Sequence, residues 1–122
     1  MTKFSIRNRI KSFKYAFKGV FYVFKTQHNA WIHLSILALV VFFGLFFRIS
    51  ILEWIAVVVV SGFVLMAEIF NTVIEVFLDK FHPARDETIG VVKDIAAGAV
   101  LIAAIAAAIT GLLIFVPKII VI

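Results

Sequence analysis

Three apolar runs, each of about 20 residues, constrain this chain more than any other feature of its sequence. An α-helix needs roughly 20 apolar residues to cross the hydrocarbon core of a bilayer. Of the 122 residues, 64% are hydrophobic and 16% are charged, which excludes a large soluble catalytic domain. We therefore expect an all-α integral membrane protein that forms a single membrane domain with three transmembrane helices.

Charged and aromatic residues mark the ends of the expected membrane helices. Counting from these marks predicts transmembrane helices at residues 28–48, 51–79 and 94–117, with a cytoplasmic loop at residues 80–93. The second helix should extend past the membrane into the cytoplasm, because about 20 residues already reach from Ile51 to Phe70. Trp31 and Trp54 are expected to anchor the first two helices at the inner and outer interfaces.

The first 26 residues carry seven positive charges and no negative charge. Apolar residues recur among them at steps of three and four, from Ile6 to Phe24, which predicts one apolar helix face. We expect residues 1–26 to form an amphipathic helix on the inner membrane interface, with the N-terminus in the cytoplasm by the positive-inside rule. Phenylalanines between the cations favour membrane lipid over nucleic acid as the partner.

Polar residues of all three expected membrane helices lie close to the inner membrane boundary. They are Gln27, Asn29, Glu68, Asn71, Glu75, Lys93 and Asp94. Each boundary is counted from a separate outer anchor, so the agreement predicts a polar site at the cytoplasmic interface.

A polar stripe on the second helix is the strongest candidate for chemistry. Its residues share one helix face because they are spaced by three or four: Glu68, Asn71, Glu75 and Asp79. Glu68 lies at the edge of the hydrocarbon, where an ionisable side chain costs up to about 2.5 to 3.5 kcal/mol, so a functional role is expected. Asp79 fits a simple ion pair equally well. Lys93 also fits a topological marker, and Asp94 also fits a helix N-cap.

The sequence lacks the signatures of several common enzyme sites. It contains no cysteine, which excludes disulfides, thiolate catalysis and cysteine-bound metals. It also contains no P-loop motif, no G-x-G-x-x-G and no H-E-x-x-H. His28, His33 and His82 are too scattered for a metal-ligand set, so we expect interfacial or capping roles for them. A phosphate site would have to be built from metal-bound carboxylates and Lys93.

Small residues on the third helix predict close helix packing. They repeat every four residues, at Ala99, Ala103, Ala107 and Gly111. This ridge fits packing within one chain and packing between chains equally well. Because three helices can hardly shield a polar face from lipid, we expect an oligomer.

Two segments resemble a known family of lipid kinases. Residues 68–79 follow the pattern E-x-x-N-T-x-x-E-x-x-x-D, and residues 93–100 follow K-D-x-x-A-G-A-V. Both are similar to motifs of the prokaryotic diacylglycerol kinase family, which includes the undecaprenol kinases. The likeness spans nearly the whole chain, including Phe17-Lys18-Gly19 and Ile32-His33. Residues 111–118 look more like the undecaprenol kinase branch.

The resemblance implies a homotrimeric kinase of the bacterial cytoplasmic membrane that transfers the γ-phosphate of Mg-ATP to a lipid alcohol. It implies Glu68 as the general base, Asn71 as the residue that orients the site and Glu75 as a Mg²⁺ ligand. The residues that it implies for nucleotide binding are Lys18, Asp79, Lys93 and Asp94. Diacylglycerol and undecaprenol both stay open as acceptors.

One position departs from the family pattern. Gln27 stands where family members commonly carry a glutamate that binds metal together with Glu75. An amide oxygen can ligate Mg²⁺ but brings no negative charge, so a lower Mg²⁺ affinity is expected. This departure keeps open a catalytically silent assembly partner. A small transporter with Glu68 and Glu75 as a proton relay is a further alternative, but the nearly featureless outer halves of the helices give it no continuous polar pathway.

Overall fold

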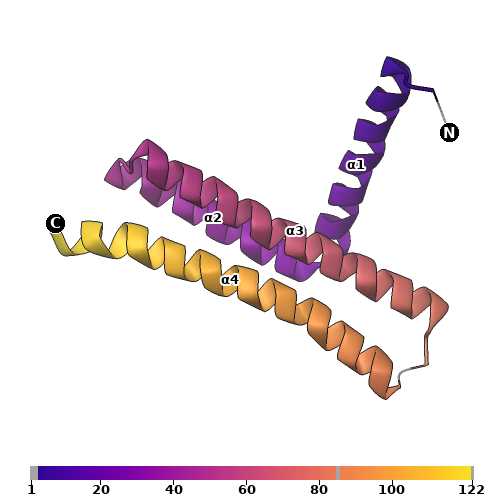
Figure 1. The fold of residues 1–122 in the computed structure, drawn as a ribbon. Helices are drawn as coiled ribbons and strands as arrows, with labels where there is room; N and C mark the ends of the chain where they lie inside the picture. Colours follow the sequence, from indigo (N-terminus) through magenta and orange to yellow (C-terminus); the bar gives the residue numbers. More distant parts are fainter. Residues whose placement is uncertain (1–2, 85, 122) are drawn as a thin grey trace.

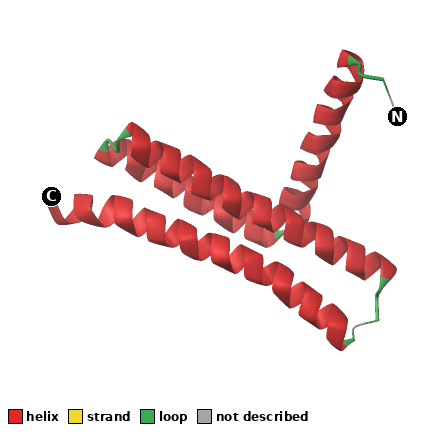
Figure 2. Ribbon diagram, in the orientation of Figure 1, coloured by secondary structure: helices red, strands yellow, loops and turns green. Residues whose placement is uncertain are grey.

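The computed structural model describes residues 3–84 and 86–121, which form four α-helices and no strand (Figures 1 and 2). The helices are α1 (Ile6–Thr26), α2 (His28–Phe47), α3 (Ile51–Phe81) and α4 (Glu87–Val121). The last three run alongside one another, whereas α1 leaves them at a steep angle (Figure 1). Each of α2, α3 and α4 is long and apolar enough to cross a membrane, which confirms the predicted all-helical fold with three candidate membrane helices.

Two of these helices are longer than a bilayer crossing requires. The 20 residues of α2 span about 30 Å, which matches the hydrocarbon core. The 31 residues of α3 and the 35 residues of α4 span about 46 and 52 Å. Because a short turn joins α2 to α3, the excess length of α3 lies at its C-terminal end, beside the loop to α4.

Local sequence explains the tight turn between α2 and α3. Arg48 adopts the left-handed conformation with φ of 54°, and the N–H of Ile49 donates to the carbonyl of Gly44. Ser50 then caps α3, because its hydroxyl accepts the N–H of Glu53 while the Glu53 carboxylate accepts the N–H of Ser50. This reciprocal capping box satisfies two backbone donors that a helix start leaves free.

The buried core of the described chain lies beside this turn. It is formed by Ile49, Val57 and Ile114, with partly buried neighbours that include Trp54. The indole ring of Trp54 lies so close to Gly44 that a Cβ added there would come within 2.6 Å of it. Trp54 therefore packs against α2 at the end of the bundle that carries the α2–α3 turn, which is the outer end in the orientation expected from the sequence.

The ends of α4 differ from the predicted span of residues 94–117. The helix begins at Glu87, because the carboxylate of Asp86 accepts the N–H of Ile89 at 2.8 Å and caps the first turn. Asp94 consequently lies inside the helix and is not its N-cap. At the other end α4 continues past Pro117, since a proline near a helix terminus removes only one hydrogen bond.

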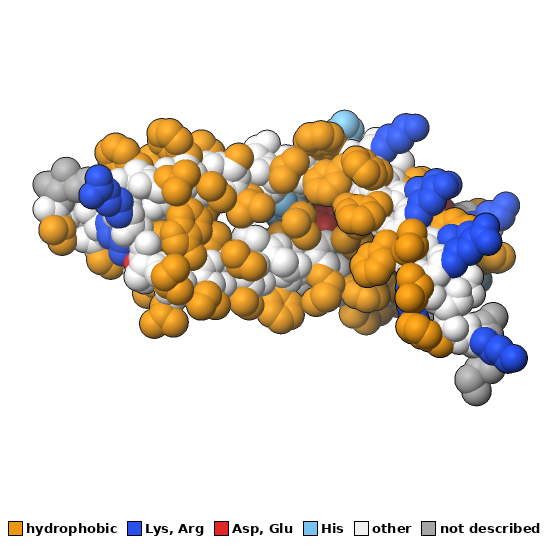
Figure 3. Space-filling model, turned by 90° about the horizontal axis from the view of Figure 1, so that it is seen from above, with side chains coloured by type: hydrophobic (Ala, Val, Ile, Leu, Met, Phe, Trp, Pro, Cys, Tyr) orange, Lys and Arg blue, Asp and Glu red, His pale blue; other side chains and the backbone are white. Residues whose placement is uncertain are grey.

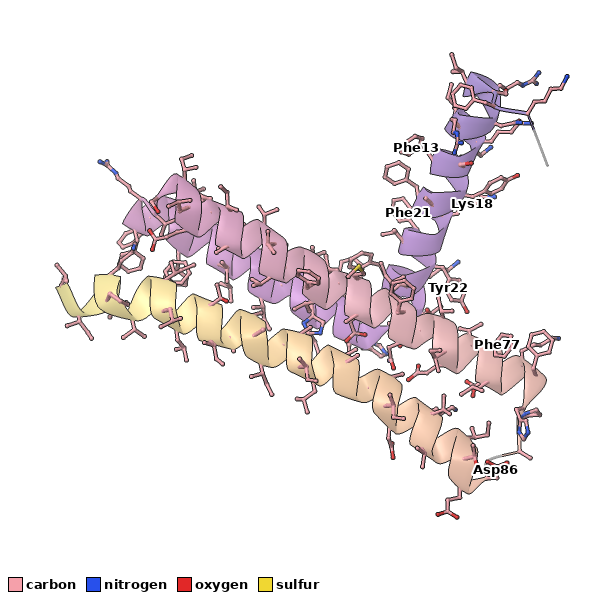
Figure 4. All side chains as sticks on the ribbon, viewed as in Figure 1. Phe13, Lys18, Phe21, Tyr22, Phe77 and Asp86 are labelled. Carbon is pink, nitrogen blue, oxygen red and sulfur yellow. The ribbon has the colours of Figure 1, made fainter. Side chains whose placement is uncertain are left out.

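The labelled side chains of α1 project in two directions (Figure 4). Phe13 and Phe21 project toward the side along which α2 and α3 run, whereas Lys18 and Tyr22 project toward the side of the α3–α4 loop (Figure 4). Val23 is the one buried residue of this helix. A single residue in extended conformation, Gln27, joins α1 to α2.

Most of the apolar surface of α2, α3 and α4 is exposed in the single chain. Hydrophobic side chains cover the length of the molecule in the space-filling view, and Lys and Arg side chains gather toward its ends (Figure 3). An apolar surface of this extent needs lipid or further protein to cover it.

Candidate active site

Glu68 is a buried carboxylate on α3. Only 2% of the residue is exposed, and its Oε1 lies 3.1 Å from Nε2 of His33 on α2. The hydroxyl of Thr72, also buried, donates to the backbone carbonyl of Glu68 and so does not engage the carboxylate. An unpaired buried carboxylate would be costly, and the contact with His33 explains how α3 can carry one here.

Asn71 and Glu75 form the next polar pair along α3. Nδ2 of Asn71 donates to Oε1 of Glu75 at 3.4 Å. Oδ1 of Asn71 is buried and accepts no hydrogen bond from the described residues. A buried acceptor without a partner costs about 1 to 3 kcal/mol, so this oxygen marks a place suited to a missing donor or cation.

Asp79 and Lys93 link α3 to α4 beyond these residues. Nζ of Lys93 donates to Oδ1 of Asp79 at 2.7 Å. The Asp79 side chain is 69% exposed, so this ion pair faces solvent and contributes little to stability. Its two side chains are accessible to a ligand that arrives from the aqueous side. We call this set the inner polar row: Glu68, Asn71, Glu75, Asp79 and Lys93.

Three predicted site residues form no hydrogen bond or ion pair with the inner polar row among the described residues. Lys18 is exposed on α1, where Nζ lies 6.0 Å from the centre of the Tyr15 ring. Gln27 is half-buried at the start of α2 and makes no capping hydrogen bond. Asp94 is exposed on α4. The structure therefore shows side-chain hydrogen bonds between Asp79 and Lys93 and between Asn71 and Glu75. It shows none from Lys18, Gln27 or Asp94 to these residues.

Glu75 and Asn71 offer oxygen donors that suit Mg²⁺. Within residues 3–84 and 86–121, no group of three or more His, Asp or Glu side chains forms a metal cage. Mg²⁺ in nucleotide sites needs no such cage, because it keeps several waters and binds one or two carboxylates plus phosphate oxygens. The Glu75 carboxylate and the unpaired Asn71 Oδ1 therefore fit an ion that arrives with a nucleotide.

An apolar groove of about 600 Å³ lies between α3 and α4 beside Asn71. Phe63, Met66 and Phe70 of α3 line one wall, and small residues of α4 that include Ala99 and Ala103 line the other. Asn71 is the one polar side chain among the described residues that line it. The groove thus offers apolar surface next to the inner polar row.

His33 is the member of the site that the sequence reasoning missed. An interfacial or capping role was expected for it, whereas the structure places it against Glu68. A signal was available, because a glutamate at the hydrocarbon edge needs a polar partner and its own helix offers no cation within a turn. His33 is a polar residue on the inner half of α2, the helix that packs beside α3.

The sequence of this chain is similar to known proteins over a region that includes every residue of the inner polar row. The sequence model of the prokaryotic diacylglycerol kinase family matches residues 14–115. The undecaprenol kinase of Bacillus subtilis (strain 168) is 36% identical over 112 residues, which cover 88% of this chain and 88% of that relative. The diacylglycerol kinase of Synechocystis sp. is 36% identical over 105 residues, which cover 85% of this chain and 60% of that relative. No solved structure matches the chain significantly.

Proposed function

Because the chain belongs to the prokaryotic diacylglycerol kinase family and is a membrane-embedded lipid kinase, we propose that it transfers the γ-phosphate of Mg-ATP to the hydroxyl of diacylglycerol or undecaprenol. The observation that carries this proposal is a buried carboxylate, Glu68, followed by an unpaired amide oxygen on Asn71. Both lie in the inner half of α3, where a lipid hydroxyl and a cytosolic triphosphate can meet.

Glu68 is proposed as the general base. It accepts the proton of the lipid hydroxyl while that oxygen forms a bond to the γ-phosphorus, and the bond from the γ-phosphorus to the β,γ-bridging oxygen breaks to release ADP. Asn71, one turn away on the same face of α3, is proposed to orient the site. In-line transfer of this kind depends mainly on positioning and on neutralising charge, which fixed side chains on one helix face supply.

The remaining members of the inner polar row are proposed to hold the nucleotide. Lys93 carries a positive charge for phosphate oxygens, and its ion pair with Asp79 is accessible from the aqueous side. Glu75, with Gln27, is proposed as the metal-binding side. When bound with the nucleotide, Mg²⁺ neutralises charge on the phosphates. Lys18 and Asp94 complete the proposed nucleotide contacts.

The proposed setting is the cytoplasmic face of the bacterial inner membrane. α1 would lie on this face, with Phe13 and Phe21 toward the lipid and Lys18 toward the cytoplasm, as their directions in Figure 4 allow. A homotrimer is proposed as the assembly, because three membrane helices can hardly shield the polar groups of α3 from lipid and the family resemblance implies three subunits.

A labelled-phosphate assay tests the proposed function directly. The purified protein in detergent micelles is given ATP labelled at the γ-phosphate, Mg²⁺ and separate lipid alcohols, including diacylglycerol and undecaprenol. Labelled lipid with one acceptor would support the kinase and identify its substrate. No labelled lipid with any acceptor would contradict it.

A catalytically silent assembly partner is the second candidate, and Gln27 is the observation that favours it. The transporter alternative gains no support, because Glu68 and Glu75 engage different partners, His33 and Asn71, in place of a shared relay.

A further inference from the structure

The partner of Glu68 is a single side chain from another helix. Nε2 of His33 lies 3.1 Å from Oε1 of Glu68, with side-chain exposures of 20% and 3%. Within the described part of the chain, no second side chain forms a hydrogen bond or ion pair with this carboxylate. Within the described residues, His33 is therefore the one side chain that orients the Glu68 carboxylate through a hydrogen bond.

The proposed role of Glu68 determines which atom of the pair carries the hydrogen. A carboxylate that acts as a base is ionised and only accepts hydrogen bonds, so in this role Nε2 of His33 is the donor and Oε1 of Glu68 the acceptor. With Oε1 occupied in this way, Oε2 is the oxygen left to accept a proton from a substrate.

We propose that His33 is a positioning residue that holds the Glu68 carboxylate by donating to Oε1 and leaves Oε2 to act as the base. This inference rests on the proposed function, because it concerns the orientation of the base in lipid phosphorylation. The role needs the bond from α2 to α3, since the Thr72 hydroxyl, one turn along α3, donates to the backbone carbonyl of Glu68 and not to its carboxylate. His33 itself is not assigned any contact with the acceptor or the nucleotide.

Kinetics of two substitutions test the role. His33→Phe keeps a planar ring but removes the donor, and kcat for lipid phosphorylation is expected to fall by about 10-fold to 100-fold, the size of losing a hydrogen bond to a charged group. The KM for Mg-ATP should stay unchanged, because Lys93 and Asp79 keep their contact. His33→Gln places an amide N–H near the position of Nε2 and is expected to restore most of kcat.

His82 provides the matched control. It lies outside the site in the α3–α4 loop, where its ring contacts the carbonyl of Ala84. His82→Gln makes the same chemical replacement as His33→Gln and should leave kcat and both KM values at the natural level. A natural kcat in His33→Phe, or a His33→Gln variant no better than His33→Phe, would overturn the positioning role while the kinase assignment stands.

A spectroscopic readout is independent of activity. Nitrogen-15 NMR of the histidine rings, with signals assigned through single His→Gln variants, should show that Glu68→Gln shifts the Nε2 signal of His33 and leaves those of His28 and His82 in place. An unmoved His33 signal would overturn the contact. If the natural protein phosphorylates no lipid alcohol, the proposed function fails and the positioning role fails with it, whereas the NMR result still reports on the hydrogen bond.

Discussion

The two ends of the α3–α4 pair carry the same kind of ion pair in different settings. At the outer end, Lys118 of α4 donates to Glu53 of α3 at 2.7 Å, and at the inner end Lys93 of α4 donates to Asp79 of α3 at the same distance. Glu53 also completes the capping box with Ser50. Every carboxylate contact at the outer end therefore serves to fix one helix against its neighbour or against the α2–α3 turn.

The inner end differs because its polar groups are not all satisfied. Glu68 is buried with one partner, and Asn71 Oδ1 is buried with none among the described residues. Such groups cost stability, so their presence at the inner end of the described chain favours a supporting role for the outer end and supports the proposed chemistry at the inner end. The predictions that follow compare the two ends, beginning with the largest expected effect.

Replacing one carboxylate at each end should give the clearest difference between the two regions in kcat and in unfolding temperature. Glu68→Gln is expected to lower kcat by a factor of about 10² to 10⁴, because the amide cannot accept the proton of the acceptor hydroxyl. Binding of ATP, followed by equilibrium titration, should persist. Glu53→Gln is expected to lower the unfolding temperature, since it weakens the capping box and the contact to Lys118, but to leave kcat unchanged.

Retained turnover in Glu68→Gln would remove its assignment as the base. A large loss of kcat in Glu53→Gln with an unchanged unfolding temperature would contradict the assignment of a supporting role to the outer end.

The two lysines provide a second comparison. Lys93→Ala is expected to raise the KM for Mg-ATP by about 10-fold or more, because a charged contact to phosphate is lost, while the unfolding temperature changes little. Lys118→Ala should leave this KM unchanged. Steady-state kinetics against ATP concentration and thermal unfolding in detergent measure both quantities. An unaltered KM in Lys93→Ala would identify this lysine as a topological marker.

Packing at the outer end can be tested at a glycine. Gly44→Ala places a methyl group 2.6 Å from an atom of the Trp54 ring, so the free energy of unfolding is expected to fall by about 1 to 3 kcal/mol. Gly62→Ala is the matched control, because a Cβ at Gly62 meets no atom within 4 Å. Chemical denaturation of both variants in the same detergent makes the measurement. Equal stabilities would show that the close packing around Trp54 is absent in solution.

The smallest expected effect concerns Gln27. Gln27→Glu adds a negative charge on the proposed metal-binding side, so the Mg²⁺ concentration for half-maximal turnover is expected to fall by about 3-fold to 10-fold. Turnover against Mg²⁺ concentration for both proteins measures this shift. Identical curves would show that this position does not influence the metal.

Much of the fold followed from the sequence because transmembrane length is a strong constraint. The apolar runs predicted membrane segments at residues 28–48 and 51–79, and the structure has helices at His28–Phe47 and Ile51–Phe81. The third predicted segment begins at residue 94, whereas the helix that contains it begins at Glu87. The hydrogen bond from Ile89 to Asp86 begins this helix at Glu87, and the charged residues there were interpreted as loop.

The candidate site was predictable only within one helix. Spacing placed Glu68, Asn71, Glu75 and Asp79 on one face of α3, because helix geometry relates residues three and four apart. The contact between His33 and Glu68 joins residues 35 apart in the sequence, and periodicity says nothing about which faces of two helices meet. The assigned roles of these residues stay predictions until the variants above are measured.

Gln27 joins α1 to α2 and also occupies the proposed metal position. Only one extended residue separates the two helices, and the indole N–H of Trp31 on α2 donates to the carbonyl of Phe24 on α1 across it. The direction in which α1 leaves the bundle and the position of the Gln27 amide are therefore set by the same junction.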